Sequence, residues 1–408
     1  MAVSLLAQEV SDLCLGKPAL RSLSVSATVA DALSALRRSG DSHLSVWTCG
    51  DYCGGGSGGN TTNKTDVSSE CRCIGKICMA DVICYLAKPE NLQNPAKALQ
   101  QPVSLLLPKV PGLVSHLEPQ ASLLEAIDLI REGAQNLVIP IHNRFTRRKL
   151  THKASSNLSL HNNREYCWLT QEDIVRYLLN SIGLFSPTPN HSIESLNIID
   201  SDLILAVHYD DPASSALPLI AKSLLTQTSV AILDSEGRIV GEISPPALNS
   251  CEEGMAAAIA TLSAGDLMAC VECGGGDLPE DLMQLVKERL EERGLGAALE
   301  LMEEESAMTL WSSSSSLSCS SSLSSSDDES GGSGRSGGRF GGGGHPGRAA
   351  RNADAVVCHP WSSLVAVMIQ ALSHRVSYAW VVEEDGTLVG VVTFAGILKV
   401  FRERLKPM

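Results

Sequence analysis

The sequence predicts an α/β (α+β) fold built from four β-α-β-β-α repeats, on the strength of three observations. Two late stretches, AILDSEGRIVGEISPPAL at Ala231–Leu248 and WVVEEDGTLVGVVTFAGI at Trp380–Ile397, align without a gap. Two earlier segments share their layout, and self-similarity at such a spacing is the signature of structural repeats. The 408 residues are 44% apolar but only 4% aromatic, which favours compact cores of Leu, Ile, Val and Ala.

The first two repeats are each predicted to contain a helix, a strand, an insertion, a second strand and a second helix. We assign residues 1–90 to the first repeat, with elements at Val29–Arg38, His43–Trp47, Cys71–Ile77 and Ala80–Leu86. We assign residues 100–184 to the second, with elements at Leu123–Glu132, Asn136–Ile141, Tyr166–Leu169 and Gln171–Leu179. These assignments follow from the layout that both segments share with the two later repeats.

The third and fourth repeats are assigned to residues 191–251 and 252–408. A helix-length apolar segment, Ala213–Leu225 or Ser362–Leu372, precedes each hairpin. The hairpins turn at Ser235-Glu236-Gly237 and at Glu384-Asp385-Gly386, and short glycine-containing links between apolar runs are hairpin signals. The motifs of the third and fourth repeats lie about twice as far apart as those of the second and third, which indicates a long insertion between them.

Polar insertions interrupt this pattern at three places. Residues 50–69 are rich in Gly, Asn and Thr, residues 142–164 are basic, and residues 312–351 form a Ser-rich and then Gly/Arg-rich linker. Such compositions cannot bury enough apolar surface to fold alone, so we expect flexible insertions. For the basic segment, phosphate binding and phosphorylation at Thr151 stay open beside a plain solvated loop, and for the Ser-rich segment phosphorylation stays open beside a plain linker. An amphipathic helix is predicted at residues 279–293, which either docks on a partner or folds back on the chain.

Composition restricts the class of protein. A net charge of −14 disfavours binding to nucleic acid, and no apolar run is long enough to span a membrane. The N-terminal residues lack a secretory or transit signal, so we expect a cytoplasmic protein, with the nucleus left open. The 13 cysteines are an odd number, which together with that compartment indicates free thiols. No nucleophile elbow, P-loop, metalloprotease or kinase signature is present, so we expect no enzyme and no catalytic residue.

The strand–turn–strand unit that ends in G-h-h-[ST]-x-x-D and continues into a helix resembles the CBS domain. The segments VSDLCLGKP and CRCIGKICMADVICYL also resemble the plant CBSX proteins. The resemblance covers about three quarters of the chain and implies that the repeats pair into two Bateman modules, at residues 1–184 and 191–408. It further implies a regulatory protein whose clefts bind adenosyl ligands.

In CBS domains the polar residues of this motif meet the ribose and phosphates of the ligand. The resemblance therefore points to six residues, namely Thr170 and Asp173 as the complete pair, Asp81 with Cys78 in place of the hydroxyl, and Ser244 and Thr393 without the acid. A helix N-terminus with a Ser or Thr cap is suited to a phosphate, and an Asp three residues later can accept ribose hydroxyls. The same pattern is also a capping box that needs no ligand.

The functional hypothesis is thus a non-catalytic sensor of AMP, ADP, ATP or S-adenosylmethionine that modulates an unknown protein partner, with no required cofactor. Two alternatives stay open, a ligand-free scaffold for protein contacts and a gamma-like subunit of an energy-sensing kinase. Either a monomer or a homodimer is compatible with the sequence.

Cysteines also gather near the first insertion, where Cys49, Cys53, Cys71 and Cys73 could supply four thiolates to zinc. The C-x-x-C knuckles of strong zinc sites are missing, so we expect free thiols and no metal.

Overall fold

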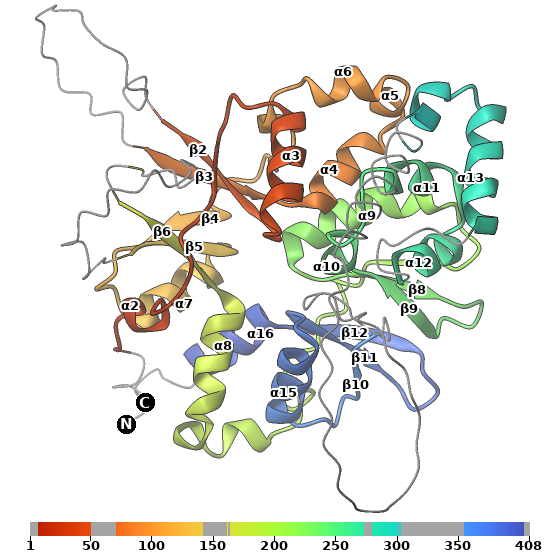
Figure 1. Cartoon of the computed structure of the whole chain (residues 1–408). Helices are drawn as coiled ribbons and strands as arrows, with labels where there is room; N and C mark the ends of the chain where they lie inside the picture. Colours follow the sequence, from red (N-terminus) through yellow and green to blue (C-terminus); the bar gives the residue numbers. More distant parts are fainter. Residues whose placement is uncertain are drawn as a thin grey trace, which may run out of the picture.

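The computed structural model describes residues 7–49, 71–141, 161, 164–272, 280–300, 302 and 355–403. It contains four three-stranded sheets, and in each the first strand runs parallel to the second, which is antiparallel to the third (Figure 1). A helix connects the two parallel strands and another follows the third strand, which confirms the predicted fold class. Residues 50–69, 312–351 and most of 142–164 lie outside the described residues, as does Cys53.

Repeat 1 begins its helical part at a capping box. Thr28 Oγ1 accepts a hydrogen bond from the Asp31 amide at 3.1 Å, and Asp31 Oδ2 accepts one from the Thr28 amide at 3.0 Å. The elements are β1 (Ser22–Ser24), α3 (Val29–Ser39), β2 (Leu44–Thr48), β3 (Arg72–Ile77) and α4 (Met79–Leu86). Three short helices follow, α5 (Pro89–Leu92), α6 (Pro95–Leu99) and η1 (Val103–Leu105).

Repeat 2 has the same order and also holds the N-terminal helix α2 (Val10–Leu13). The Val10 amide donates to the carbonyl of Ala121 at 2.9 Å, and Val10 and Cys14 are buried in the core of repeats 2 and 4. The N-terminal segment therefore crosses repeat 2 before the chain enters β1. The elements are β4 (Val114–His116), α7 (Leu123–Arg131), β5 (Asn136–Pro140), β6 (Tyr166–Thr170), α8 (Gln171–Asn180), η2 (Ile182–Phe185) and η3 (Thr188–Asn190).

Repeat 3 is followed by three further helices. Its elements are β7 (Ala206–His208), α9 (Ala213–Thr226), β8 (Val230–Leu233), β9 (Ile239–Ile243) and α10 (Pro245–Leu248), and the helices are α11 (Met255–Thr261), α12 (Ala264–Glu272) and α13 (Glu280–Glu292). Helix α13 is the predicted amphipathic helix. It buries Val286 and Leu290, and Arg289 Nη1 donates to the carbonyl of Thr261 at the end of α11 at 2.5 Å. The helix thus folds back on the chain.

Repeat 4 starts after the Ser-rich linker. Its elements are β10 (Val357–Cys358), α15 (Leu364–His374), β11 (Tyr378–Val382), β12 (Leu388–Thr393) and α16 (Phe394–Glu403). The hairpins of repeats 3 and 4 turn at glycines with positive φ, Gly237 at 78° and Gly386 at 87°, as the sequence predicts.

The repeats pack in two ways. The sheets of repeats 1 and 2 share one small cluster around Trp47 and Tyr166, and those of repeats 3 and 4 share another around Tyr378 and Trp380. The helices form two larger cores, one between repeats 1 and 3 and one between repeats 2 and 4. The four repeats therefore surround a common centre (Figure 1). No helix among the described residues has both the length and the hydrophobicity to cross a bilayer.

Candidate functional site

A cavity of about 2660 Å³ opens where the four repeats meet, and every repeat contributes to its wall. Lys76 of repeat 1, Thr170 of repeat 2, Ser244 of repeat 3 and Tyr378 of repeat 4 are among its lining residues. Ligand pockets usually enclose roughly 300–1,000 Å³, so this space exceeds what one small molecule needs.

The six residues singled out from the sequence are distributed unequally around this cavity. Four of them, Cys78, Asp81, Thr170 and Ser244, line it. Asp173 and Thr393 are not among the described residues of the wall. The cavity therefore collects positions from repeats 1, 2 and 3, while repeat 4 contributes the end of α15 and the start of β11 instead.

In repeat 1 the motif forms the N-terminus of α4. Asp81 Oδ2 accepts hydrogen bonds from the Cys78 amide at 2.8 Å and from its thiol at 3.1 Å. Burial raises the pKa of Asp81 to about 6 and keeps the pKa of the Cys78 thiol well above its usual range, so the thiol remains a donor at neutral pH. The sulfur atom thus takes the place of the hydroxyl in this cap.

In repeat 2 the complete Thr/Asp pair is a capping box tied to the N-terminal segment. Asp173 Oδ2 accepts from the Thr170 amide at 2.8 Å and from its hydroxyl at 2.7 Å. Lys17 Nζ forms an ion pair with the same carboxylate and also donates to the Trp168 carbonyl at 2.8 Å. The acid predicted to contact ribose is therefore held in a structural role, and Thr170 faces the cavity.

The motifs of repeats 3 and 4 are caps without an acid. Ser244 Oγ accepts from the Ala247 amide at 3.3 Å, and Thr393 Oγ1 accepts from the Gly396 amide at 3.2 Å. The helix-capping interpretation thus holds in all four repeats. Capping leaves the remaining first-turn amides of a helix available to an anion, so it does not exclude a ligand.

The glycine that leads the motif has a packing role in repeats 1 and 3. A Cβ atom on Gly75 would lie 2.4 Å from Leu107 Cδ2, and one on Gly241 would lie 2.3 Å from Met268 Sδ. Because neither glycine has a side chain, Leu107 and Met268 can pack directly against the strand backbone.

Charged side chains of both signs line the cavity. Among the described residues the wall contains six Lys or Arg and six Asp or Glu side chains, namely Arg37, Lys76, Lys88, Lys109, Arg176, Arg375, Asp41, Asp81, Glu172, Glu242, Glu252 and Glu272. Arg176 pairs with Glu172, and Arg37 lies 3.9 Å from Glu252. Lys76, Lys88, Lys109 and Arg375 form no ion pair with another described residue, although Lys88 Nζ lies 5.6 Å from the centroid of the Tyr85 ring.

Lys76 lines the cavity from the end of β3. Its Nζ donates to Asn136 Oδ1 at 3.2 Å, and burial lowers its pKa from the usual range. The neighbouring His43 has a pKa well below its usual value, first because of burial and then because of Lys76. A partly buried ammonium group that forms no ion pair gains from an anionic ligand.

Sequence reasoning missed two features of the wall. Glu242 is buried and accepts hydrogen bonds from Tyr378 Oη and Trp380 Nε1, both at 2.7 Å, and burial raises its pKa. Arg375 follows α15 with φ at +56°, a conformation rare outside glycine. Glu242 occupies a variable position of the repeated motif and Arg375 lies outside it, so only the packing of repeats 3 and 4 reveals their roles.

Comparisons with known proteins agree with this architecture. The CBS domain family model matches residues 352–403, which span repeat 4. Protein MJ1225 of Methanocaldococcus jannaschii, described as a proposed archaeal homologue of γ-AMPK, superposes with a TM-score of 0.51 over 97% of this chain and 100% of its own, at 14% identity. The similarity to MJ1225 supports the fold alone.

Full-length relatives from Arabidopsis thaliana are also similar to this chain. CBS domain-containing protein CBSX6 is 26% identical over 98% of the chain and 94% of its own length. A gamma-like regulatory subunit of SNF1-related protein kinase, PV42b, is 22% identical over 97% and 95%. CBS domain-containing protein CBSX5 is 47% identical over 100% of the chain and 99% of its own length, and the chain therefore belongs to the CBS-domain-containing proteins of the CBSX type.

Proposed function

We propose that this chain is a non-catalytic regulatory protein whose central cavity binds an adenine nucleotide or S-adenosylmethionine and thereby modulates a partner protein. The observation that carries the proposal is the group of four cavity cations, Lys76, Lys88, Lys109 and Arg375, for which the described residues supply no ion-pair partner. Cytoplasmic location remains part of this proposal.

The wall offers suitable groups for each part of such a ligand. The N-termini of α4 and α8 open on the cavity at Cys78 and Thr170, where amides and the helix dipole favour phosphate. Asp81 also lines the cavity, and its carboxylate would accept a ribose hydroxyl. A ligand that touches Lys76 of repeat 1 and Arg375 of repeat 4 would stabilise one relative arrangement of these repeats, which is a population shift that a partner can read.

Isothermal titration calorimetry tests the proposal. AMP, ADP, ATP and S-adenosylmethionine are titrated separately into the wild-type chain and into Arg375→Ala and Arg176→Ala. We expect one of the ligands to bind the wild type below millimolar Kd, and Arg375→Ala to weaken it about tenfold or more, as loss of a charge-assisted hydrogen bond does. Arg176 also lines the cavity but pairs with Glu172, so Arg176→Ala serves as the matched control with a smaller effect.

Two further candidates each have a supporting observation. Similarity over nearly the full length to a gamma-like kinase subunit favours a role in a kinase complex, and co-purification with a catalytic subunit of an SNF1-related kinase would test it. Leu107 packs over Gly75 and Met268 packs over Gly241, where the motif begins, and this packing favours a ligand-free scaffold. If no adenosyl compound binds at millimolar concentration, the scaffold replaces the sensor.

A further inference from the structure

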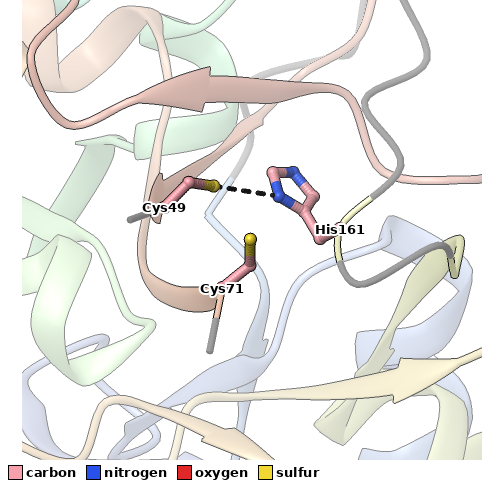
Figure 2. Close-up of side chains that lie close together, drawn as sticks. All are labelled: Cys49, Cys71 and His161. Atoms are coloured by element: carbon pink, nitrogen blue, oxygen red, sulfur yellow. Dashed lines mark hydrogen bonds between the residues drawn. The ribbon is translucent and has the colours of Figure 1, made fainter. Parts of the chain in front are cut away.

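Three side chains that can bind a metal ion meet at the outer end of the β2–β3 hairpin. Thr48 pairs with Arg72 at the end of the antiparallel ladder, so the next residues outward, Cys49 and Cys71, face each other. Figure 2 shows the Cys49 sulfur directed toward the imidazole of His161 and the Cys71 sulfur close to both; His161 lies between β5 and β6 in the sequence. The His161 ring stacks on Trp47 at 3.7 Å between centroids, with 3° between the planes.

The positions of the donor atoms are close to those of a tetrahedral zinc site. Cys49 Sγ lies 3.3 Å from His161 Nδ1, and the ligand atoms of all three residues lie within 4.8 Å of one another. Zinc–sulfur bonds of ~2.3 Å and zinc–nitrogen bonds of ~2.0–2.1 Å at a tetrahedral angle place S and N ligands about 3.6 Å apart and two S ligands about 3.8 Å apart. Shifts of no more than about 1 Å would therefore complete the geometry.

The chemistry of the ligands suits a soft divalent cation. Cysteine sulfur and histidine ring nitrogen are the ligand atoms that zinc sites in proteins commonly use. The Nε2 atom of His161 is buried and has no hydrogen-bond partner among the described residues, so the ring depends on stacking and on its Nδ1 contact for stabilisation. Cys71 is buried and Cys49 is exposed, which leaves an approach from solvent on the side of Cys49.

We propose that Cys49, Cys71 and His161 bind one Zn²⁺ ion, with a water molecule as the fourth ligand. Binding would convert two thiols to thiolates with release of two protons, and the two thiolate charges would neutralise the dication. Cys49 and Cys71 flank the insertion at residues 50–69, and His161 lies near the end of the insertion at residues 142–164. The ion would therefore link the β2–β3 hairpin to the β5–β6 hairpin.

This site differs from the zinc arrangement considered from the sequence. Cys73 is buried and its Sγ faces the Gly75 carbonyl at 3.5 Å, so it does not join the cluster. His161, which lies 112 residues from Cys49, supplies a ligand instead. The expectation of no metal is thus replaced by a proposal that rests on three-dimensional proximity.

The proposed zinc site is independent of the nucleotide cavity. Cys71 precedes β3 and Cys78 follows it, so the two sites lie at opposite ends of one strand, roughly 20 Å apart at ~3.3 Å per residue. Failure of one proposal therefore leaves the other unaffected.

Cobalt and zinc titrations of the full chain test the site. The reduced protein is stripped with a chelator, and Co²⁺ is added to detect the sulfur-to-cobalt charge-transfer absorption that thiolate ligation produces. Zn²⁺ affinity is then measured by competition with a chromophoric chelator. We expect one thiolate-bound cobalt per chain, displaced by zinc, and a loss of zinc affinity of about 100-fold or more in Cys49→Ser, Cys71→Ser and His161→Ala, since even outer-shell partners change it 10–100-fold.

The control is Cys73→Ser, which removes a buried thiol two residues along the same strand and should leave cobalt absorption and zinc affinity unchanged. The proposal is overturned if the wild type shows no charge-transfer absorption, or if the absorption survives in all three ligand variants. It is also overturned if metal-free and metal-treated chains both contain a Cys49–Cys71 disulfide. The wild-type spectrum decides the matter even if a variant does not fold.

Discussion

The carboxyl group of Asp81 provides the most quantitative prediction from this structure, because burial raises its pKa from 3.8 to about 6. The perturbation is Asp81→Asn, which keeps the side chain's shape and an oxygen acceptor for the Cys78 amide but cannot ionise. Burial is the largest cause of the raised pKa, and the hydrogen bonds from Cys78 and the charge of Lys76 oppose it.

The direction of the pH effect on stability follows from the protonation of Asp81 in the folded and the unfolded chain. Below about pH 4 the carboxyl is protonated in the folded and unfolded chain alike. Between about pH 4 and pH 6 the unfolded chain loses this proton while the folded chain retains it, so the free energy of unfolding falls. Above about pH 6 both states are ionised and the loss is constant. A pKa that is higher by about 2 in the folded chain corresponds to about 3 kcal/mol. The free energy of unfolding of Asp81→Asn, relative to that of the wild type, should therefore rise by about 3 kcal/mol between about pH 4 and pH 7.

Urea unfolding of both proteins across this pH range measures the difference. Other buried acids, such as Glu242 and Glu253, also have raised pKa values, but they are common to both proteins and cancel. The reasoning is refuted if the difference in unfolding free energy between wild type and variant does not change with pH.

Asp31→Asn is the matched control, since Asp31 holds the same helix position in α3. Hydrogen bonds from Thr28 lower the pKa of this exposed carboxyl, so its stabilising contribution is present at neutral pH and is lost as the pH falls through the folded pKa. Asp31→Asn should therefore lose stability relative to wild type as pH rises, which is the opposite sign to Asp81→Asn.

Two further predictions concern packing between and within repeats. Arg402 of repeat 4 donates two hydrogen bonds, of 2.8 and 2.9 Å, to the carboxylate of Asp128 in repeat 2. A double-mutant cycle with alanine at both sites, measured by thermal unfolding, should therefore give a coupling free energy of about 1 kcal/mol. A coupling of zero would contradict the contact. Gly75→Ala should cost about 1 kcal/mol because its Cβ would meet Leu107, and Leu107→Ala in the same chain should recover part of this; an unchanged Tm in Gly75→Ala would argue against the close approach.

Local features of the fold were predictable from the sequence because short-range chemistry determines them. The hairpin turns at Gly237 and Gly386 follow from glycine and acidic residues between apolar runs. Helix α3 begins after Thr28, where the sequence offers a cap and an acid three residues later. The amphipathic pattern of α13 likewise indicates a helix, although it does not show on which surface the helix packs.

Long-range features could not be predicted in the same way. Asp173 pairs with Lys17 over 156 residues, and His161 meets Cys49 over 112 residues. Both contacts depend on how the N-terminal segment and the hairpins pack against repeat 2, which no local spacing encodes. The sequence motif correctly locates four helix N-termini, whereas the direction each faces is set by the arrangement of repeats around the cavity.

Hydrogen–deuterium exchange of the full chain with and without saturating adenosyl ligand tests the central claim most directly. If the cavity is the binding site, slower exchange should occur together in segments 76–86, 105–110 and 373–378, which line it from repeats 1 and 4 and the connection after repeat 1. The β2–β3 residues at the outer end of the hairpin should exchange at unchanged rates. Unchanged exchange in all three cavity segments, or protection confined to another surface, would contradict the account.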